Sequence, residues 1–332
     1  MLLLNPVENK VKVLIIRFSS IGDIVLTTPV IRCLKQQLEG DVEIHYLTKA
    51  AYIALLEGNP YLTKIHTISK TTNEVIEQLK AENFDYVVDL HKNLRSSRVK
   101  KRLKAFSFSF NKLNIQKWLL VNFKLNKMPD VHIVDRYLEA VKALGIENDG
   151  KGLDYFLPPD IEKTFSEKFP EKYTALVLGA NHATKRMPKH KLIDLLESSN
   201  QQFVLIGGEE DEALGKELEQ IDPKRIKNAC GKTNLNQSAY LIQQAKSVVT
   251  PDTGMMHIAA AFQKQITSIW GNTVPAFGMY PYLSKENLGN SHILEVKGLS
   301  CRPCSKIGFD KCPKGHFKCM EQIDVEEIRE ML

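Results

Sequence analysis

The chain has 332 residues, of which 43% are hydrophobic and 25% are charged. This length predicts two domains with buried cores, and the composition excludes a disordered or low-complexity chain. The net charge of +6 is mild, but it is unevenly distributed along the sequence.

The sequence contains no segment typical of membrane insertion or export. No run reaches the roughly 18 uninterrupted apolar residues that a membrane-spanning helix needs. The first residues, MLLLNP, lack a basic region, and their apolar run ends at Asn5 and Pro6, so we do not expect a signal peptide. We therefore expect a cytoplasmic protein.

The first half alternates apolar runs with helical patterns. Residues 12–17 (KVLIIR) form a short, β-branched run that predicts a buried strand. A helical stretch to about residue 38 follows, and Pro29 is expected to kink it or to start its main helix. The other predicted elements are strands at 42–47 and 86–90 and helices at 73–82 and 135–144, the last closed by Gly145. Such alternation indicates βαβ units and a parallel sheet.

The pattern breaks at residues 157–172, which we interpret as a linker with a short helix. The alternation then restarts. Strands are predicted at 174–178, 202–206, 247–250 and 265–270, and helices at 189–198, 210–219, 236–245, 254–261 and 325–332. The sequence therefore predicts an α/β protein with two Rossmann-like, doubly wound domains facing across a cleft. Their predicted ranges are 1–158 and 159–332, and the terminal helix could pack back on the first domain.

A polar loop with Ser19, Ser20, Gly22 and Asp23 lies between the first predicted strand and helix. Such a turn directs side chains toward a ligand at the carboxyl edge of a parallel sheet, and Gly22 permits close backbone approach. Asp23 is a candidate general base. Serine and aspartate here are also explained as helix caps. The loop matches neither the G-x-G-x-x-G fingerprint nor a P-loop.

A second loop, residues 251–257, has the same position in the second half. Thr253 and Gly254 would present backbone N–H groups at a helix N-terminus, where the dipole favours a phosphate. Asp252 would cap the turn or orient a donor. His257 lies one turn into the helix, where both a structural and a catalytic role remain open.

Charged residues follow two more of the predicted strands. Lys185 and Arg186 suit a diphosphate, whose charge needs neutralising as it leaves, or they form a solvated basic turn. Glu209 follows two glycines after the strand at 202–206. An acid there can accept from ribose hydroxyls or interact with a helix dipole.

Four of the six cysteines fall close together near the end of the chain: Cys301, Cys304, Cys312 and Cys319. Four thiolates can hold zinc tetrahedrally, but here only one C-x-x-C pair has the usual spacing. Structural zinc and reduced cysteines in a compact loop are both open. Disulfides are disfavoured in a cytosolic chain.

The segment 91–129 has eleven Lys or Arg residues and no Asp or Glu. The rest of the chain has 34 basic against 39 acidic residues, a net charge of −5. Aromatic and leucine residues interleave with this basic segment, a composition that favours an anionic lipid surface. Nucleic acid is not expected, because no nucleic-acid-binding module accompanies it. A solvated face over a core helix is the alternative.

These motifs together resemble glycosyltransferase family 9, the lipopolysaccharide heptosyltransferases and their relatives. They are SSIGD, GANHATKRMP, LIGGEED, PDTGMMHIAAA and the terminal cysteine group, which occur in the same order in that family. The resemblance covers about residues 11–325. It implies a GT-B fold and an inverting transfer from ADP-heptose to the lipopolysaccharide inner core, on the cytoplasmic face of the inner membrane.

The resemblance also implies roles for single residues. Asp23 would be the base, Lys185 would contact the diphosphate, and Thr253 and Gly254 would bind phosphate. Glu209 would reach the ribose. The site's remaining expected members are Arg186, Thr233 near adenine, Asp252 and His257 on the donor side, and Ser19, Ser20, Gly22, Lys92, Arg95 and Arg98 on the acceptor side.

In this scheme Asp23 takes the proton of the acceptor hydroxyl, Lys185 neutralises the departing ADP, and no cofactor is required. The expected partners are ADP-heptose, an anionic glycolipid and the membrane surface. Three alternatives stay open: a relative with another donor or acceptor, a nucleotide-sugar 2-epimerase, and a non-catalytic glycolipid-binding protein.

Overall fold

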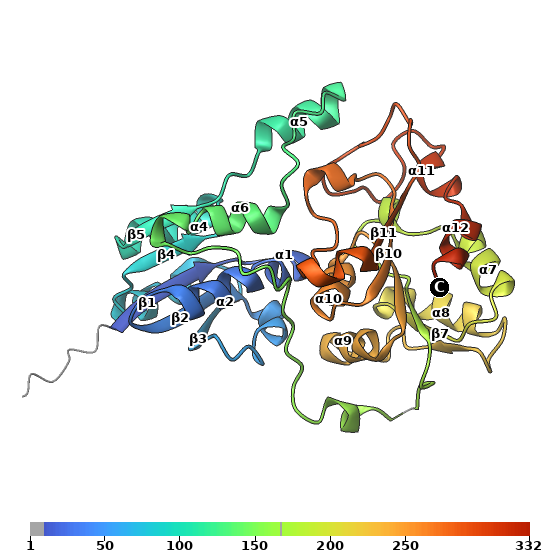
Figure 1. Ribbon diagram of the computed structural model, residues 1–332, viewed down its shortest axis with the longest axis horizontal. Coiled ribbons are helices and arrows are strands. Elements are labelled where there is room, and N and C mark those ends of the chain that lie inside the picture. Colours follow the sequence, from blue (N-terminus) through green and yellow to red (C-terminus); the bar gives the residue numbers. More distant parts are fainter. Residues whose placement is uncertain (1–9, 167) are drawn as a thin grey trace, which may run out of the picture. The chain divides into compact units, whose positions relative to one another are not determined.

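The computed structural model describes residues 10–166 and 168–332 (Figure 1). The expectation that no signal peptide lies at residues 1–6 falls outside these residues. The chain divides into two compact units. The first unit comprises Met1–Lys112 and Val134–Asp149, and the second comprises Leu113–Ile133 and Gly150–Leu332.

The first unit is built on a five-stranded parallel sheet with the order β3-β2-β1-β4-β5 (Figure 1). Its strands are β1 (Lys10–Ile16), β2 (Asp41–Lys49), β3 (Lys64–Ile68), β4 (Tyr86–Asp89) and β5 (Phe106–Ser109). The apolar run from Val13 to Ile16 is completely buried, as expected for the central strand of a sheet covered on both faces.

Helices connect these strands, as the alternating pattern predicts. They are α1 (Ile21–Val25), α2 (Thr28–Gln37), α3 (Ile76–Ala81), α4 (Leu94–Leu103) and α6 (Ile133–Glu139), with short 3₁₀ segments at Ala50–Leu55, Thr72–Glu74 and Lys142–Leu144. Pro29 lies in the first turn of α2, so it starts this helix rather than kinking it. Arg32 of α2 binds both carboxylate oxygens of Asp149, at 2.7 and 2.8 Å, and so holds the end of the unit on its sheet.

The second unit contains a six-stranded parallel sheet with the order β11-β10-β9-β6-β7-β8. The strands are β6 (Thr174–Val177), β7 (Phe203–Ile206), β8 (Ile226–Asn228), β9 (Ser247–Pro251), β10 (Gln265–Trp270) and β11 (Ser291–Glu295). β6, β7 and β9 are buried along their whole length, which fits their mostly apolar residues.

The helices of the second unit lie before, between and after these strands in the chain. They are α5 (Asn114–Phe123), α7 (Lys189–Ser198), α8 (Glu212–Glu219), α9 (Leu235–Gln244), α10 (Gly254–Ala261), α11 (Lys318–Glu321) and α12 (Val325–Glu330). Short 3₁₀ segments occur at Ile161–Thr164, Ala183–Lys185, Glu209–Asp211, Pro275–Phe277 and Lys285–Asn290. The predicted helices at 189–198 and 254–261 match α7 and α10 residue for residue.

Two details of the predicted domain organisation differ from the structure. The contacts of segment 113–133 place it in the second unit, and that unit already begins at Gly150, ahead of the predicted boundary at 158. The terminal helix α12 packs within the second unit. Ile328 of α12 is fully buried in the apolar core that Leu192 and Leu195 of α7 form, and α12 lies beside α7 (Figure 1).

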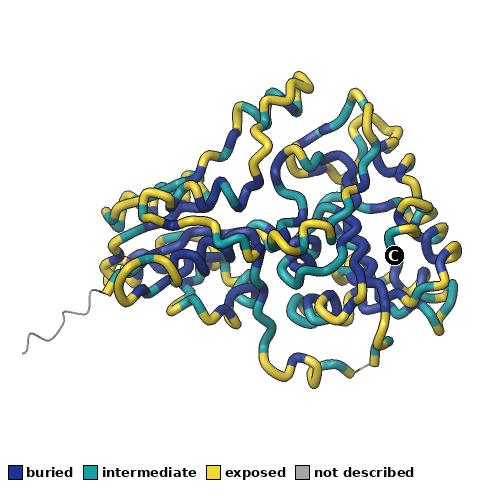
Figure 2. The backbone as a smooth tube through the Cα atoms, in the orientation of Figure 1, coloured by how far each residue is buried: buried dark blue, intermediate teal, exposed yellow. Residues whose placement is uncertain are grey.

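The described residues include no helix that is both long and apolar enough to span a bilayer. The segment 113–127 is nevertheless largely exposed, as Figure 2 shows along its tube. Its exposed apolar side chains are Ile115, Trp118, Phe123 and Leu125.

Candidate functional site

Each sheet has one point where the strand order reverses. In the first unit the chain runs outward from β1 to β2 and β3, then returns to β4 on the other side of β1. In the second unit it runs from β6 to β7 and β8, then returns to β9. Ligands of open parallel sheets bind outside the carboxyl ends of the strands at such switch points. The loops after β1, β4, β6 and β9 are therefore the candidate sites.

The loop after β1 holds Asp23 in a fixed position. The Ser20 backbone N–H and its hydroxyl donate to Asp23 Oδ2, at 3.2 and 2.9 Å. Ser20 is the N-cap of α1 and Asp23 is its third residue, so the pair forms a capping box. The capping interpretation is thus correct, and it leaves Oδ1 of Asp23 for another partner. Gly22 is buried beneath the turn and Ser19 is half-buried.

That partner is Arg17, which the sequence analysis missed. Its guanidinium lies 2.6 Å from Asp23 Oδ1 and donates to the carbonyls of Ser19 and Leu90 and to the Tyr137 hydroxyl. Burial raises the pKa of Asp23, but Arg17 and the Ser20 hydrogen bonds outweigh it and hold that pKa below its usual range. The carboxylate is therefore ionised at neutral pH and aimed by two fixed groups.

The loop after β4 adds further polar groups on the same sheet. Asp89, fully buried, accepts from the backbone N–H groups of His91 and Lys92 and from the Ser96 hydroxyl. Burial, with the charge of Arg17, lowers the pKa of His91 to about 4, so its imidazole is neutral at pH 7. Its ring lies 5.0 Å from that of Phe18, which places His91 beside the β1 loop.

The predicted acceptor-side cations fall into two kinds. Lys92 has an internal partner, because its ammonium donates to the Phe110 carbonyl at 2.9 Å. Arg95 and Arg98 are exposed on α4. The structure thus brings Ser20 and Asp23 together, whereas Arg95 and Arg98 present a separate basic surface.

In the second unit, Lys185 and Asp252 meet across the switch point. Lys185 follows β6 and its ammonium lies 2.6 Å from Asp252 Oδ2, just after β9. Thr273, which follows β10, donates its hydroxyl to the same oxygen at 2.8 Å. Asp252 therefore positions the lysine at the carboxyl edge of the sheet, which fits its predicted role as an orienting group.

Thr253 and Gly254 begin α10, as predicted. The Thr253 side chain is the N-cap and accepts from the Met255 N–H at 3.1 Å. The start of this helix therefore points its N–H groups and its positive dipole toward the lysine's side of the sheet. His257 is 3% exposed within α10. That burial favours its structural interpretation over a catalytic one.

Arg186 is anchored on the loop after β7. It binds Asp211 Oδ1 at 2.9 Å, and its Nε donates to the Ala180 carbonyl. A β-carbon at Gly179 would lie 2.4 Å from Asp211 Oδ2, so this loop needs glycine there to pack on the buried carboxylate. Glu209 is exposed at the carboxyl end of β7, where a bound group can reach it.

Thr233 lies after β8, at the edge of the same sheet. Its hydroxyl contacts the Ala229 carbonyl at 3.2 Å and the Ser238 hydroxyl at 2.9 Å, so it also fixes the start of α9. From β9 to β8 the row of strand ends spans three strand spacings, about 14 Å. Cations occupy one end of this row and Thr233 the other, which is an arrangement suited to an extended nucleotide.

The terminal cysteines form a loose group. All four are free, and the charges of Cys301, Cys304 and Cys312 all influence Cys319, whose pKa burial raises to about 11. Within the described residues, no three of these sulfurs lie within 4.8 Å of one another. Tetrahedral zinc would draw them closer, so zinc at this loop stays a prediction beside reduced thiols.

Sequence reasoning missed several residues that complete these loops. Arg17 ends the first strand run and could have been noticed as a charge following four apolar residues. Asp89 and His91 stand at the end of YVVDLH, the same position relative to β4 that Asp23's loop has relative to β1. Thr273 and Asp211 carry no local signal, because their roles come from partners 21 and 25 residues away.

The chain is similar in sequence and in fold to known proteins. A family model described as "Glycosyltransferase family 9 (heptosyltransferase)" matches residues 72–305. Lipooligosaccharide heptosyltransferase 2 of Haemophilus influenzae is 32% identical over 184 residues, 48% of this chain and 52% of that protein. The chain thus matches about half the length of this relative.

Solved structures resemble the chain over almost its whole length. A family 9 glycosyl transferase from Veillonella parvula has a TM-score of 0.76 at 18% identity, covering 96% of this chain and 95% of its own. The ADP-heptose LPS heptosyltransferase II of E. coli has a TM-score of 0.71 at 20% identity, covering 96% and 97%. These similarities confirm the predicted GT-B fold with its two parallel-sheet domains.

Proposed function

Since this chain belongs to glycosyltransferase family 9 and is a glycosyltransferase, we propose that it moves a heptose from ADP-heptose to the lipopolysaccharide inner core. The observation that carries this proposal is Lys185, held by Asp252 across the second switch point and beside the start of α10. A cation and a helix N-terminus together suit the diphosphate of a nucleotide sugar. The name of the E. coli structural relative supports ADP-heptose as that donor.

The donor would lie along the carboxyl ends of the second sheet. Its diphosphate would contact Lys185 and the N–H groups of Thr253 and Gly254, and Arg186 would add a second cation. Its ribose would meet Glu209 and its base would approach Thr233. In this arrangement the Asp252 carboxylate keeps the ammonium in place before the donor arrives.

The acceptor would lie over the first switch point. Asp23 is ionised, so it can take the proton of the attacking hydroxyl as the new bond to the anomeric carbon forms. The bond from that carbon to the diphosphate oxygen breaks on the opposite face, and the configuration inverts. Lys185 and the start of α10 then stabilise the charge on the departing ADP.

We also propose that the protein works peripherally on the cytoplasmic face of the inner membrane. Four exposed apolar side chains in segment 113–127 stand among Lys117, Lys124 and Lys127. This combination of aromatic and basic groups suits an anionic lipid surface. Arg95 and Arg98, exposed on α4 of the first unit, would meet the phosphates of a glycolipid acceptor.

Calorimetric titration with ADP, ADP-heptose, UDP and GDP tests the donor assignment. We expect ADP to bind, the heptose to tighten binding, and Lys185→Ala to weaken it. Lys189→Ala is the matched control, because Lys189 is half-exposed at the start of α7 and its ammonium pairs with Glu217. A preference for UDP or GDP would be consistent with a glycosyltransferase but would contradict ADP-heptose as its donor.

A further inference from the structure

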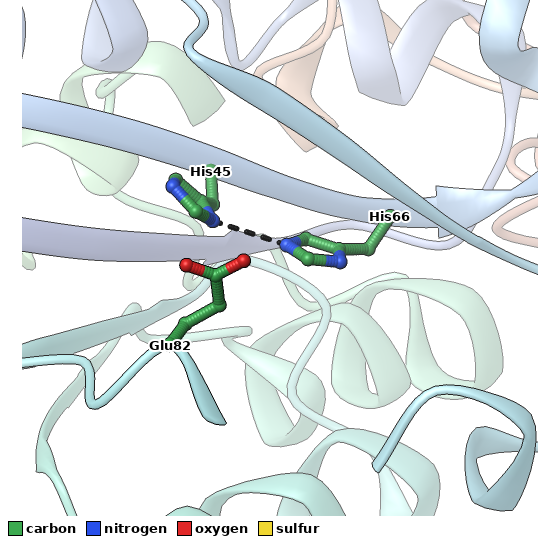
Figure 3. A group of neighbouring side chains, drawn as sticks. All are labelled: His45, His66 and Glu82. Carbon is green, nitrogen blue, oxygen red and sulfur yellow. Dashed lines mark hydrogen bonds between the residues drawn. The ribbon is translucent and has the colours of Figure 1, made fainter. Parts of the chain in front are cut away.

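Two buried histidines meet on the first sheet, on β2 and β3. His45 lies opposite Lys64 in the parallel register, and His66 is two residues further along β3, so both side chains share one face of the sheet. They are 2% and 4% exposed. Figure 3 shows the two rings turned toward each other and the carboxylate of Glu82 directed at them from a different segment.

The distances among these groups suit a metal ion. His45 Nδ1 and His66 Nε2 are 3.0 Å apart, and a Glu82 oxygen completes a set whose atoms all lie within 4.8 Å of one another. Neighbouring nitrogens around tetrahedral zinc, at Zn–N of about 2.0–2.1 Å, are about 3.3 Å apart. The two rings therefore need to separate by only a few tenths of an ångström to bind one ion.

Two lysines compete for the same carboxylate. Lys12 and Lys64 donate to different oxygens of Glu82, at 3.0 and 2.7 Å. Each carboxylate oxygen has a second lone pair, so it can accept a lysine proton and still bind a metal. The Lys64 side chain is half-exposed, so its ammonium can rotate away from Glu82 toward the solvent. Lys12 can stay hydrogen-bonded to the carboxylate and orient it toward the metal.

We propose that His45, His66 and Glu82 form a site for one divalent transition-metal ion of the Zn²⁺ type, with water completing its coordination. Two imidazoles and a carboxylate are an established ligand set for zinc. The Phe84 ring lies in a T-shaped arrangement with both imidazoles, at centroid distances of 5.1 Å from His45 and 6.4 Å from His66. The site does not depend on the glycosyl transfer proposed above.

The position of the site indicates a structural role. Its ligands come from the middle of β2 and β3 and from the end of α3, whereas the transfer chemistry is proposed at the carboxyl ends of the strands. A bound ion would tie the connection before β4 to β2 and β3, in addition to the hydrogen bond that Lys64 of β3 already makes with Glu82. Binding to the folded state alone would raise the melting temperature in a concentration-dependent way.

The test uses the full chain with all four terminal cysteines changed to serine, so that they cannot bind the added metal. Zn²⁺ is titrated against a competing chelator, and Co²⁺ gives an absorption spectrum of its coordination. We expect one equivalent bound, with a tetrahedral Co²⁺ spectrum lacking sulfur charge-transfer bands. His66→Gln should weaken Zn²⁺ binding by about 100-fold or more. His190→Gln, on the exposed surface of α7, should not change it.

Two further variants keep the proposal testable if His66→Gln fails to fold. Glu82→Gln should weaken Zn²⁺ binding, whereas Lys64→Gln should strengthen it severalfold, because it removes the competing cation. If His45 and His66 only form a hydrogen bond in the core, neither Glu82→Gln nor Lys64→Gln should change Zn²⁺ binding. The proposal would be overturned if no Zn²⁺ bound at micromolar concentrations. It would also be overturned if one equivalent bound with an affinity that none of these substitutions changed.

Discussion

The ion pair between Arg17 and Asp23 offers a sharp test of how the first unit is built. Arg17→Met keeps much of the side chain's volume but removes the charge, the bond to Asp23 and the donors to three oxygens. The Arg17 and Asp23 side chains are 10% and 23% exposed, so water cannot readily replace the lost partner. We expect this single change to destabilise the first unit strongly.

The size of the effect follows from the geometry. Unit charges 2.6 Å apart attract by about 6 kcal/mol at an effective dielectric constant near 20. Desolvation offsets much of that attraction, and removing one partner of a buried pair typically costs about 3–5 kcal/mol. For a unit of this size that loss corresponds to a melting temperature roughly 10–20 °C lower.

The pH dependence has a definite sign. Because the folded pKa of Asp23 is lowered, the pair's contribution to stability is present above the unfolded aspartate pKa of about 3.9 and disappears as the pH falls through the folded value. Arg17→Met should therefore flatten the stability profile below pH 4. The substitution should also raise the pKa of Asp23. The pH below which the transfer rate falls should therefore be higher in the variant than in the wild type.

Urea unfolding of wild type, both single variants and Arg17→Met/Asp23→Asn gives the coupling energy of the pair. We expect about 1–3 kcal/mol between the two positions. Coupling near zero, together with an Arg17→Met protein as stable as wild type, would refute the view that this pair positions the base.

Three further predictions test other parts of the molecule. Lys185→Ala should raise the calorimetric Kd for ADP by about 10- to 100-fold, since hydrogen bonds to charged groups contribute about 1.5–3 kcal/mol. Trp118 is 55% exposed and the only other tryptophan is buried, so anionic vesicles should shift the fluorescence of Trp118 to the blue, and Trp118→Glu should weaken vesicle binding in sedimentation. Ile328→Ala should lower the unfolding free energy by about 2–5 kcal/mol in urea titrations, because the side chain is fully buried against α7.

Each of these predictions has a control and a contrary result. For ADP, Lys189→Ala should bind like wild type, and equal losses in both variants would contradict a specific diphosphate contact. For vesicles, Leu288→Glu changes another exposed apolar side chain of the second unit, which is 65% exposed, and equal weakening there would contradict a membrane role for segment 113–127. An Ile328→Ala protein with wild-type stability would contradict the packing of α12 on α7.

Much of the fold could be predicted from local sequence patterns. Interior strands are rich in apolar residues, because both of their faces are covered, and this makes β1 and β7 (FVLI) conspicuous. The four edge strands, β3, β5, β8 and β11, were missed. β5 (FSFS) is exposed on part of its length and lies within the basic segment, and β3 (KIHTI) carries a lysine and a histidine. Their strand character depends on pairing with β4 and β2 rather than on their own hydrophobicity.

The sequence predicted which loops carry the candidate site residues, but it did not predict the hydrogen bonds and ion pairs between those residues. Position after a strand sufficed to select Asp23, Lys185 and Asp252. The partner of Asp23 depends on Arg17 being held by Tyr137, which is 120 residues away and on another helix. No local rule links such positions. Likewise, segment 113–133 packs with the second unit through contacts such as Lys124 with the Pro303 carbonyl.

The measurement that tests the central proposal most directly is turnover of ADP-heptose with heptose-free inner-core glycolipid, in wild type and in Asp23→Asn. We expect the wild-type enzyme to add heptose and release ADP in equal amounts. Asp23→Asn should lose about 10²–10⁴-fold in rate and yet bind ADP with unchanged affinity. A variant that turns over at the wild-type rate would contradict Asp23 as the base. A wild-type enzyme that binds ADP-heptose and transfers nothing to this acceptor would contradict the proposed inner-core reaction.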